Sequence, residues 1–163
     1  MNIKVLVKLV TSKHMGKLLR LCLQHPLFVG PSFMATKKCV KISNKLYGNL
    51  HHKNGPENAF RHALWNYLIA KKCYRWRPKT EKILFWTAAI THLHELFSPN
   101  SELAKAMDLH NNKVGRELFL ANMDKEIAEV VLLLEEMTLA SQKVTELEEI
   151  RQYGTKLIHI VEV

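Results

Sequence analysis

The stretch 54-NGPENAFRHALWN-66 decides the fold of this sequence and raises the question of its function. It opens with an Asn-Gly turn and a proline, and a proline is best tolerated at the first position of a helix. Apolar residues at helical spacing follow, which predicts a helix that packs into a core. One stripe of that helix is nevertheless polar, and it carries Asn58, Arg61, His62 and Asn66. A helix that only fills a core has no use for such a stripe.

The composition predicts a single all-α domain. The chain has 163 residues, about the size of one domain with one hydrophobic core. Its hydrophobic fraction of 47% and charged fraction of 24% are typical of globular proteins and exclude wholesale disorder. Residues 60–75 and 82–97 contain neither glycine nor proline, which favours helices. We therefore expect a single-domain helical bundle of about six to seven helices, with the three scattered cysteines reduced in its core.

Turn and capping signals divide the chain into helices. Pro31, Pro56, Thr80, Ser101 and Asp124 mark the expected starts. The first three of these helices are expected to end near Gly48, Arg75 and Phe97. Residues 141–154 are polar with a helical pattern, and the tail 156-KLIHIVEV-163 is expected to be a short strand or a frayed end. No repeat or linker interrupts this order.

Residues 1–30 form a basic, amphipathic N-terminal arm, and residues 31–163 form the helical domain in this division. Lysines break the apolar run before Thr11, so this segment is a poor signal peptide and too short a membrane span. Two interpretations are open: a helix lying on an anionic membrane surface, or an arm docked on the domain. We expect a cytoplasmic protein, peripheral at the membrane in the first case. The basic residues concerned are Lys4, Lys8, Lys13, Lys17 and Arg20.

The net charge of +9 is concentrated in the first half of the chain. Residues 1–82 hold 17 Lys and Arg against two acids, whereas residues 83–163 hold 7 against 13. A basic face of this kind suits an anionic substrate or a membrane surface, although the two halves can also pack together and neutralise each other. No nucleic-acid-binding motif is present, and most aromatic residues fall at helical core spacing.

Two further helices carry polar stripes. Thr91, His94 and Glu95 are neighbours on the helix expected over 80–97, and His92 points almost opposite to His94. On the next helix Asp108, Asn111 and Asn112 share a face, and His110 points away. Because buried polar groups must find one another, the three stripes are expected to converge.

The converging groups have the composition of a metal site or an acid–base site. Two imidazoles and one or two carboxylates hold zinc, manganese or iron with a position left for water. We predict His62, His94 and Asp108 as metal ligands, with Glu95 as a proton shuttle and Arg61 on an anionic group. The remaining candidate site residues are Asn58, Asn111 and Asn112. The alternative is a satisfied buried network that fixes the packing of the helices.

The sequence matches two known metal-binding motifs only in part. His94-Glu95 begins like HExxH, but Ser98 stands where the second histidine is required. The order of FRHALWN and AAITHLHEL loosely resembles the HD phosphohydrolases, which are all-helical. In those enzymes an aspartate follows the second histidine, whereas Glu95 follows it here.

Three blocks together resemble an uncharacterised family of small all-helical bacterial domains. The family pattern is NGPxxAFRHAxWN, then a His-Glu pair, then MDLHNNxxGR, and the chain carries all three blocks between about residues 50 and 118. The resemblance implies relatives that occur alone and at the ends of large secreted, toxin-like proteins. It also implies that the polar positions are functional, and that many relatives have Asp where this chain has Asn58.

These observations favour a metal-assisted hydrolase that acts on a phosphoester or a lipid head-group. The alternative is a non-catalytic interaction module, whose buried polar network sets the fold and whose basic half binds an acidic partner.

Overall fold

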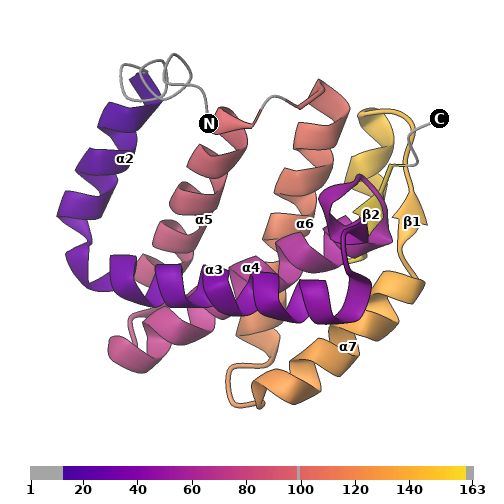
Figure 1. Ribbon diagram of the computed structural model, residues 1–163. Coiled ribbons are helices and arrows are strands. Elements are labelled where there is room, and N and C mark those ends of the chain that lie inside the picture. Colours follow the sequence, from indigo (N-terminus) through magenta and orange to yellow (C-terminus); the bar gives the residue numbers. More distant parts are fainter. Residues whose placement is uncertain (1–12, 99, 161–163) are drawn as a thin grey trace.

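The computed structural model describes residues 13–98 and 100–160 of the chain. This part is all-α, with six α-helices, two 3₁₀ turns and one pair of very short strands (Figure 1). The helices are α2 (Lys13–Gln24), α3 (Pro26–Tyr47), α4 (Pro56–Trp76), α5 (Thr80–Phe97), α6 (Glu102–Ala121) and α7 (Ile127–Leu139). The 3₁₀ turns span Leu50–His52 and Glu148–Gln152, and the strands are β1 (Gln142–Lys143) and β2 (Ile158–His159). The expected helical bundle is confirmed.

Helix α4 is the centre of the fold. It packs against α3, α5, α6 and α7, and Figure 1 shows it behind α3. Phe60, Leu64 and Tyr67 are fully buried along one side of the helix and Ile69 on the opposite side, and a helix that is apolar on opposite sides must be covered on both. The opening stretch of sequence therefore builds the core and carries the polar stripe into it.

The starts of three helices follow the signals in the sequence. Helix α4 begins at Pro56, where the missing amide proton costs no hydrogen bond, and Glu57 lies favourably in its first turn. Helix α5 begins at Thr80 as expected. The Ser101 side chain caps α6 by accepting a hydrogen bond of 3.2 Å from the Ala104 amide.

The predicted start of the preceding helix at Pro31 is wrong, because α3 begins at Pro26 and continues through Pro31. Pro26 occupies the first helical position, so only His25 interrupts the chain between α2 and α3. A proline at position 31 deprives the Leu27 carbonyl of its helical donor, and this is tolerated because Leu27 lies on the exposed side, within reach of solvent.

The predicted cap at Asp124 is also wrong. Helix α7 is capped two residues later, where Glu126 and Glu129 form a capping box and the Glu126 amide donates to Glu129 Oε2 at 2.9 Å. This reciprocal pair satisfies two free amides, which a single Asp124 side chain does not achieve. Asp124 lies in the exposed turn before α7.

The helix expected over 141–154 is replaced by β1 and a 3₁₀ turn. Residues 142 and 143 pair in parallel with 158 and 159, with hydrogen bonds of 2.9 Å from the Gln142 amide to the Leu157 carbonyl and from the Val144 amide to the His159 carbonyl. Long-range pairing thus overrides the local helical pattern. The expected strand in the tail is confirmed at Ile158–His159, and residues 161–163 lie outside the described part.

The N-terminal helix α2 packs against α5 and α3, and its Leu21 is buried in the core. The expected division at residue 30 lies inside α3, and Lys4 and Lys8 lie outside the described residues. Within the described part, no helix is both long and apolar enough to cross a bilayer. The three cysteines are free, and Cys39 and Cys73 are buried.

Helices α4 and α6 approach each other closely at Gly115. A Cβ atom on Gly115 would lie 2.1 Å from the Ala63 carbonyl oxygen, far inside van der Waals contact. The contact is backbone against backbone, so no side chain can move aside. This crossing places the residue next to Ala63, which is His62, beside the polar stripe of α6.

Gly115→Ala is therefore expected to lower the free energy of unfolding by about 3 kcal/mol, because the helices must separate to admit the methyl group. Urea unfolding followed by circular dichroism measures the change. The matched control is Gly16→Ala on α2, where an added Cβ meets nothing within 4 Å and helix propensity predicts a gain of up to about 1 kcal/mol. Equal effects at the two glycines would contradict the close crossing.

Candidate metal centre

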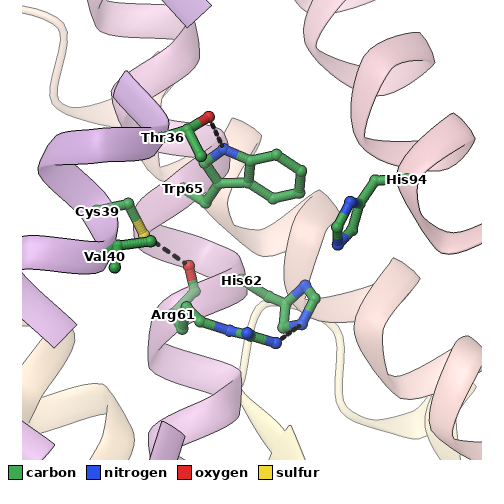
Figure 2. A pocket seen from close by; sticks show the side chains of 7 residues that line it. All are labelled: Thr36, Cys39, Val40, Arg61, His62, Trp65 and His94. Atoms are coloured by element: carbon green, nitrogen blue, oxygen red, sulfur yellow. Dashed lines mark hydrogen bonds between the residues drawn. The ribbon is translucent and has the colours of Figure 1, made fainter. Parts of the chain in front are cut away.

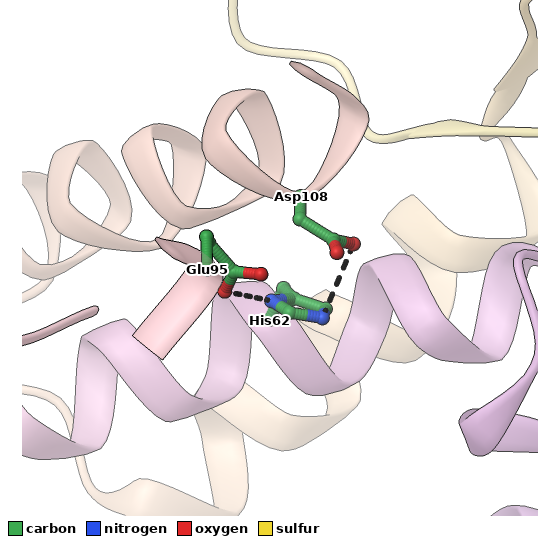
Figure 3. A group of neighbouring side chains, drawn as sticks. All are labelled: His62, Glu95 and Asp108. Atoms are coloured by element: carbon green, nitrogen blue, oxygen red, sulfur yellow. Dashed lines mark ion pairs between the residues drawn. The ribbon is translucent and has the colours of Figure 1, made fainter. Parts of the chain in front are cut away.

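One side chain from each of three helices meets in the interior. His62 from α4, Glu95 from α5 and Asp108 from α6 are only 3%, 1% and 2% exposed, and Figure 3 shows the imidazole between the two carboxyl groups. His62 Nδ1 lies 3.6 Å from Glu95 Oε1, and His62 Nε2 lies 3.2 Å from Asp108 Oδ1. One potential ligand atom from each residue lies within 4.8 Å of the others. Such a separation allows one ion to contact all three.

The hydrogen bonds around His62 assign its tautomer. Asn112 Oδ1 already accepts a hydrogen bond of 2.6 Å from Asn66 Nδ2, and it lies 3.2 Å from His62 Nδ1. Nδ1 therefore carries the proton and donates to this oxygen. The lone pair of Nε2 then accepts a hydrogen bond of 2.9 Å from the Arg61 guanidinium and faces Asp108. An imidazole fixed in this way by its other nitrogen is the form that binds metals.

A network of amides holds these groups in place. Asn112 Nδ2 donates to Glu95 Oε1 at 3.4 Å, and Asn66 Oδ1 accepts from Thr91 Oγ1 at 3.2 Å and from Arg116 Nη1 at 2.9 Å. The network therefore joins α4, α5 and α6. Asn112 contacts both His62 and Glu95, so it positions the two residues relative to each other.

Burial dominates the electrostatics of the centre. The pKa of His62 is lowered from 6.5 to about 3 by burial first, and then by the positive charge of Arg61. The pKa of Asp108 is raised from 3.8 to about 7, by burial first and then by the neighbouring carboxylate of Glu95. At neutral pH the imidazole is therefore neutral, and the Asp108 carboxyl group, with its pKa raised to about 7, exchanges its proton with solvent in that range.

Asp108 has an oxygen whose hydrogen-bonding capacity is unused. Its Oδ2 accepts from Asn100 Nδ2 at 3.2 Å, but its buried Oδ1 has no hydrogen-bond partner, although His62 Nε2 is 3.2 Å away. The short approach is not a hydrogen bond, because Nε2 presents a lone pair to this oxygen. A lone pair and a carboxylate oxygen this close need a cation or a proton between them. The residues therefore fit a divalent metal ion, and they equally fit a protonated Asp108.

A pocket of about 110 Å³ reaches this centre from the surface between α3, α4 and α5. Arg61 and His62 lie together on one side of it, and Figure 2 shows Trp65 and His94 facing each other across it. Its lining residues are Thr36, Cys39, Val40, Arg61, His62, Trp65 and His94. The Trp65 indole is fixed by a hydrogen bond of 2.8 Å to Thr36 Oγ1. The pocket is thus apolar along α3 and polar at Arg61 and His62.

His94, the expected third ligand, is placed differently from Glu95. It is exposed, its ring lies edge-on to Trp65 with 5.0 Å between centroids, and it is absent from the group that can share an ion. Glu95, expected to shuttle protons, takes that place in the group. His92 is exposed, and His110 Nε2 hydrogen-bonds the Lys156 carbonyl at 2.8 Å, so neither contacts the centre.

Two of the candidate asparagines have different surroundings. Asn111 is buried, and its amide binds the backbone of Ile158 in both directions, donating to the carbonyl at 2.9 Å and accepting from the amide at 3.0 Å. It anchors β2 to α6 rather than touching His62. Asn58 is buried one turn before His62, and its Oδ1 has no hydrogen-bond partner within the described structure.

Sequence reasoning did not select Asn100 and Arg116 as site residues. Arg116 lies one turn after Asn112 on the same face of α6, so helical spacing could have indicated it as a site residue. Asn100 lies in the turn before α6, where no periodicity applies, so only the fold brings it to Asp108.

The family described as a domain of unknown function (DUF6973) matches residues 19–142. The chain belongs to this family. The matched region contains α4, α5 and α6, and therefore every residue of the centre. Comparisons with curated proteins and with solved structures gave no significant match.

The raised pKa of Asp108 makes a specific prediction about stability in the presence of a chelator. Between pH 3.8 and about 7 the folded protein holds a proton on Asp108 that the unfolded chain has lost, so this residue makes the fold less stable as pH rises. Asp108→Asn removes this effect. The variant should gain stability relative to the wild type from pH 4 to pH 8, as measured by urea unfolding.

The control for this pH series is Asp124→Asn, which removes an exposed carboxylate in the turn before α7. It supplies the effect of losing one negative charge from the protein. A stability difference for Asp108→Asn that shrinks with rising pH would show that Asp108 is ionised and stabilised by a cation in the folded protein.

Proposed function

We propose that this protein is a metal-assisted hydrolase of phosphoesters, with its centre at His62, Glu95 and Asp108. The observation that carries the proposal is the short approach of a neutral, buried imidazole to a partnerless carboxylate oxygen, beside a second carboxyl group. The donor set of one imidazole and two carboxylates suits zinc or manganese. Bound there, a divalent ion supplies a Lewis acid that polarises a phosphoryl group and activates water.

The residues around the centre have separate tasks in this proposal. His62 offers Nε2 and Asp108 offers Oδ1 to the ion, while Asn112 fixes the imidazole through Nδ1. Glu95 lies beside Asp108, whose pKa is raised to about 7, so the two carboxyl groups are placed to pass a proton between them. Glu95 thus keeps its expected role as proton shuttle and also stands within reach of the ion.

Arg61 connects the centre to an anionic substrate. Its guanidinium donates to His62 Nε2, the same lone pair that a metal ion takes, and it lines the pocket. Within the described residues it forms no ion pair with a carboxylate. Release of Nε2 therefore frees a half-buried cation to bind a phosphate in the pocket, where it would be strongly attracted. His94 at the rim is placed to contact the leaving group.

The setting of this activity is part of the proposal. The sequence pattern favours a bacterial protein with relatives in toxin-like proteins, and a cytoplasmic or peripheral location. A lipid head-group is one phosphoester that the pocket suits, because its α3 side is apolar.

Metal binding is the first test. Zinc or manganese in hundredfold excess over the dissociation constant should stabilise the protein by about 2.7 kcal/mol, measured as a rise in melting temperature and by calorimetry. Asp108→Asn should abolish this rise, because it removes an anionic ligand. His92→Ala, which removes an exposed histidine on the same helix as Glu95, should retain it. A rise that survives Asp108→Asn would place the metal elsewhere.

Replacement of Glu95 by Gln tests the chemistry. If Glu95 moves protons, activity on a panel of phosphomonoesters, phosphodiesters and phospholipids with added metal should fall by a factor on the order of 10² to 10⁴. Its melting temperature should stay nearly constant or rise, because functional carboxylates are held in unfavourable surroundings.

The second candidate function is a non-catalytic interaction module. It is favoured by the continuous network through Asn66, Thr91, Asn112 and Arg116, which joins three helices without any ligand. In that case Glu95→Gln should lower stability by about 1 to 3 kcal/mol, through a mispaired Asn112. A clear loss of stability with no wild-type activity on any substrate would favour the module over the enzyme.

A further inference from the structure

A second surface of the molecule combines exposed apolar side chains with cations. It lies where the first turns of α3 run beside the last turn of α4 and the start of α5, at one end of the molecule in Figure 1. One hollow of about 420 Å³ is lined by Pro31, Met34, Lys72, Arg75 and Trp76. A neighbouring hollow of about 170 Å³ includes Leu27, Arg77, Lys79 and Lys82. We call the two hollows together the α3–α4 edge.

The apolar part of this edge lies along α3 and at the end of α4. Leu27, Pro31 and Met34 recur at helical spacing and therefore lie along one stripe of α3. Leu27 is 51% exposed, Met34 is 55% exposed, and Trp76 beside them is 67% exposed. Single exposed apolar residues are ordinary, but a Leu, a Met and a Trp gathered in adjoining hollows indicate a surface that is covered by something.

The charged part of the edge is almost entirely positive. Residues 71–82 contain six Lys and Arg and a single acid, Glu81. None of these cations forms an ion pair with a carboxylate in the described structure. The pKa of Lys38 is lowered by burial first and then by Lys72, with only Glu126 opposing, so like charges crowd the edge. The partner must therefore be anionic as well as apolar.

We propose that the α3–α4 edge docks the protein on an anionic lipid bilayer. Trp76, Leu27 and Met34 enter the head-group region, and the flanking Lys and Arg side chains bind lipid phosphates. A tryptophan between two arginines suits this boundary, because its ring is apolar and its indole N–H stays in reach of water. The proposal concerns a surface separate from the pocket at His62 and does not depend on hydrolase activity.

Other occupants fit the edge less well. A nucleic acid would meet the cations but would leave Leu27 and Met34 against a polar backbone. Residues 1–12 of the chain carry Lys4 and Lys8 and no acid. This segment is therefore positively charged like the edge, and the edge would repel it. A second copy docked edge to edge would bring like charges together.

Vesicle sedimentation with the full chain tests the proposal. Binding to phosphatidylcholine vesicles should be weak, should grow with added phosphatidylglycerol, and should fall with salt as screening shortens to about 8 Å at physiological ionic strength. Trp76 should report insertion through a blue-shifted emission that brominated lipid quenches. Trp76→Phe should lose that shift, since Trp86 is buried and Trp65 is held in the pocket wall.

A charge-matched pair of variants locates the surface. The triple variant of Arg75, Arg77 and Lys79 to Gln should lower the partition coefficient roughly a hundredfold, because each interfacial cation contributes about fivefold. All three side chains are exposed, so the fold is spared. The control variant replaces three exposed cations of the C-terminal region, Lys143, Arg151 and Lys156, by Gln and should bind as the wild type does.

Several outcomes would overturn the proposal. They are equal binding to neutral and anionic vesicles, equal losses in the two triple variants, and binding to a single-stranded oligonucleotide but not to vesicles. Light scattering that shows a dimer broken by the edge variant would assign the surface to a second copy instead.

Discussion

The centre of this molecule depends on the contact between two helix backbones. Gly115 lets α6 lie against the Ala63 carbonyl of α4, and no other residue leaves room for that approach. Gly115 shares a stripe with Asp108 and Asn112, two turns and one turn away along α6, and Ala63 follows His62. The same close crossing therefore sets the distance from imidazole to carboxylate. If α4 and α6 were farther apart, their buried polar groups could not hydrogen-bond to each other.

Much of this arrangement was predictable from the sequence, because helical periodicity is local. The polar stripes of three consecutive helices correctly predicted that His62, Glu95 and Asp108 meet. Periodicity gives the face on which a side chain lies but not how far a helix is rotated relative to its neighbours. For that reason both His94 and Glu95, adjacent in sequence, were expected in the centre, and only the packed helices show Glu95 buried there and His94 exposed.

The remaining differences arise where distant contacts outweigh local signals. The pattern over 141–154 favours a helix, but pairing with Ile158 and His159 draws Gln142 and Lys143 into a strand. Asn111 has the spacing of a site residue, yet the Ile158 backbone occupies its amide completely. No single-sequence rule contains this information, because the partners lie more than ten residues apart and are chosen by the tertiary fold.

The way in which Asn111 holds Ile158 also bears on how this sequence can vary. The carboxamide imitates the edge of a neighbouring strand, and it recognises main-chain atoms that every residue except proline presents. Position 158 is thus free to exchange its side chain, subject only to the size of the space that Ile158 fills. Position 111 has no such freedom: aspartate lacks the donor, and glutamine is one methylene too long. Among relatives, position 158 should therefore vary more than position 111.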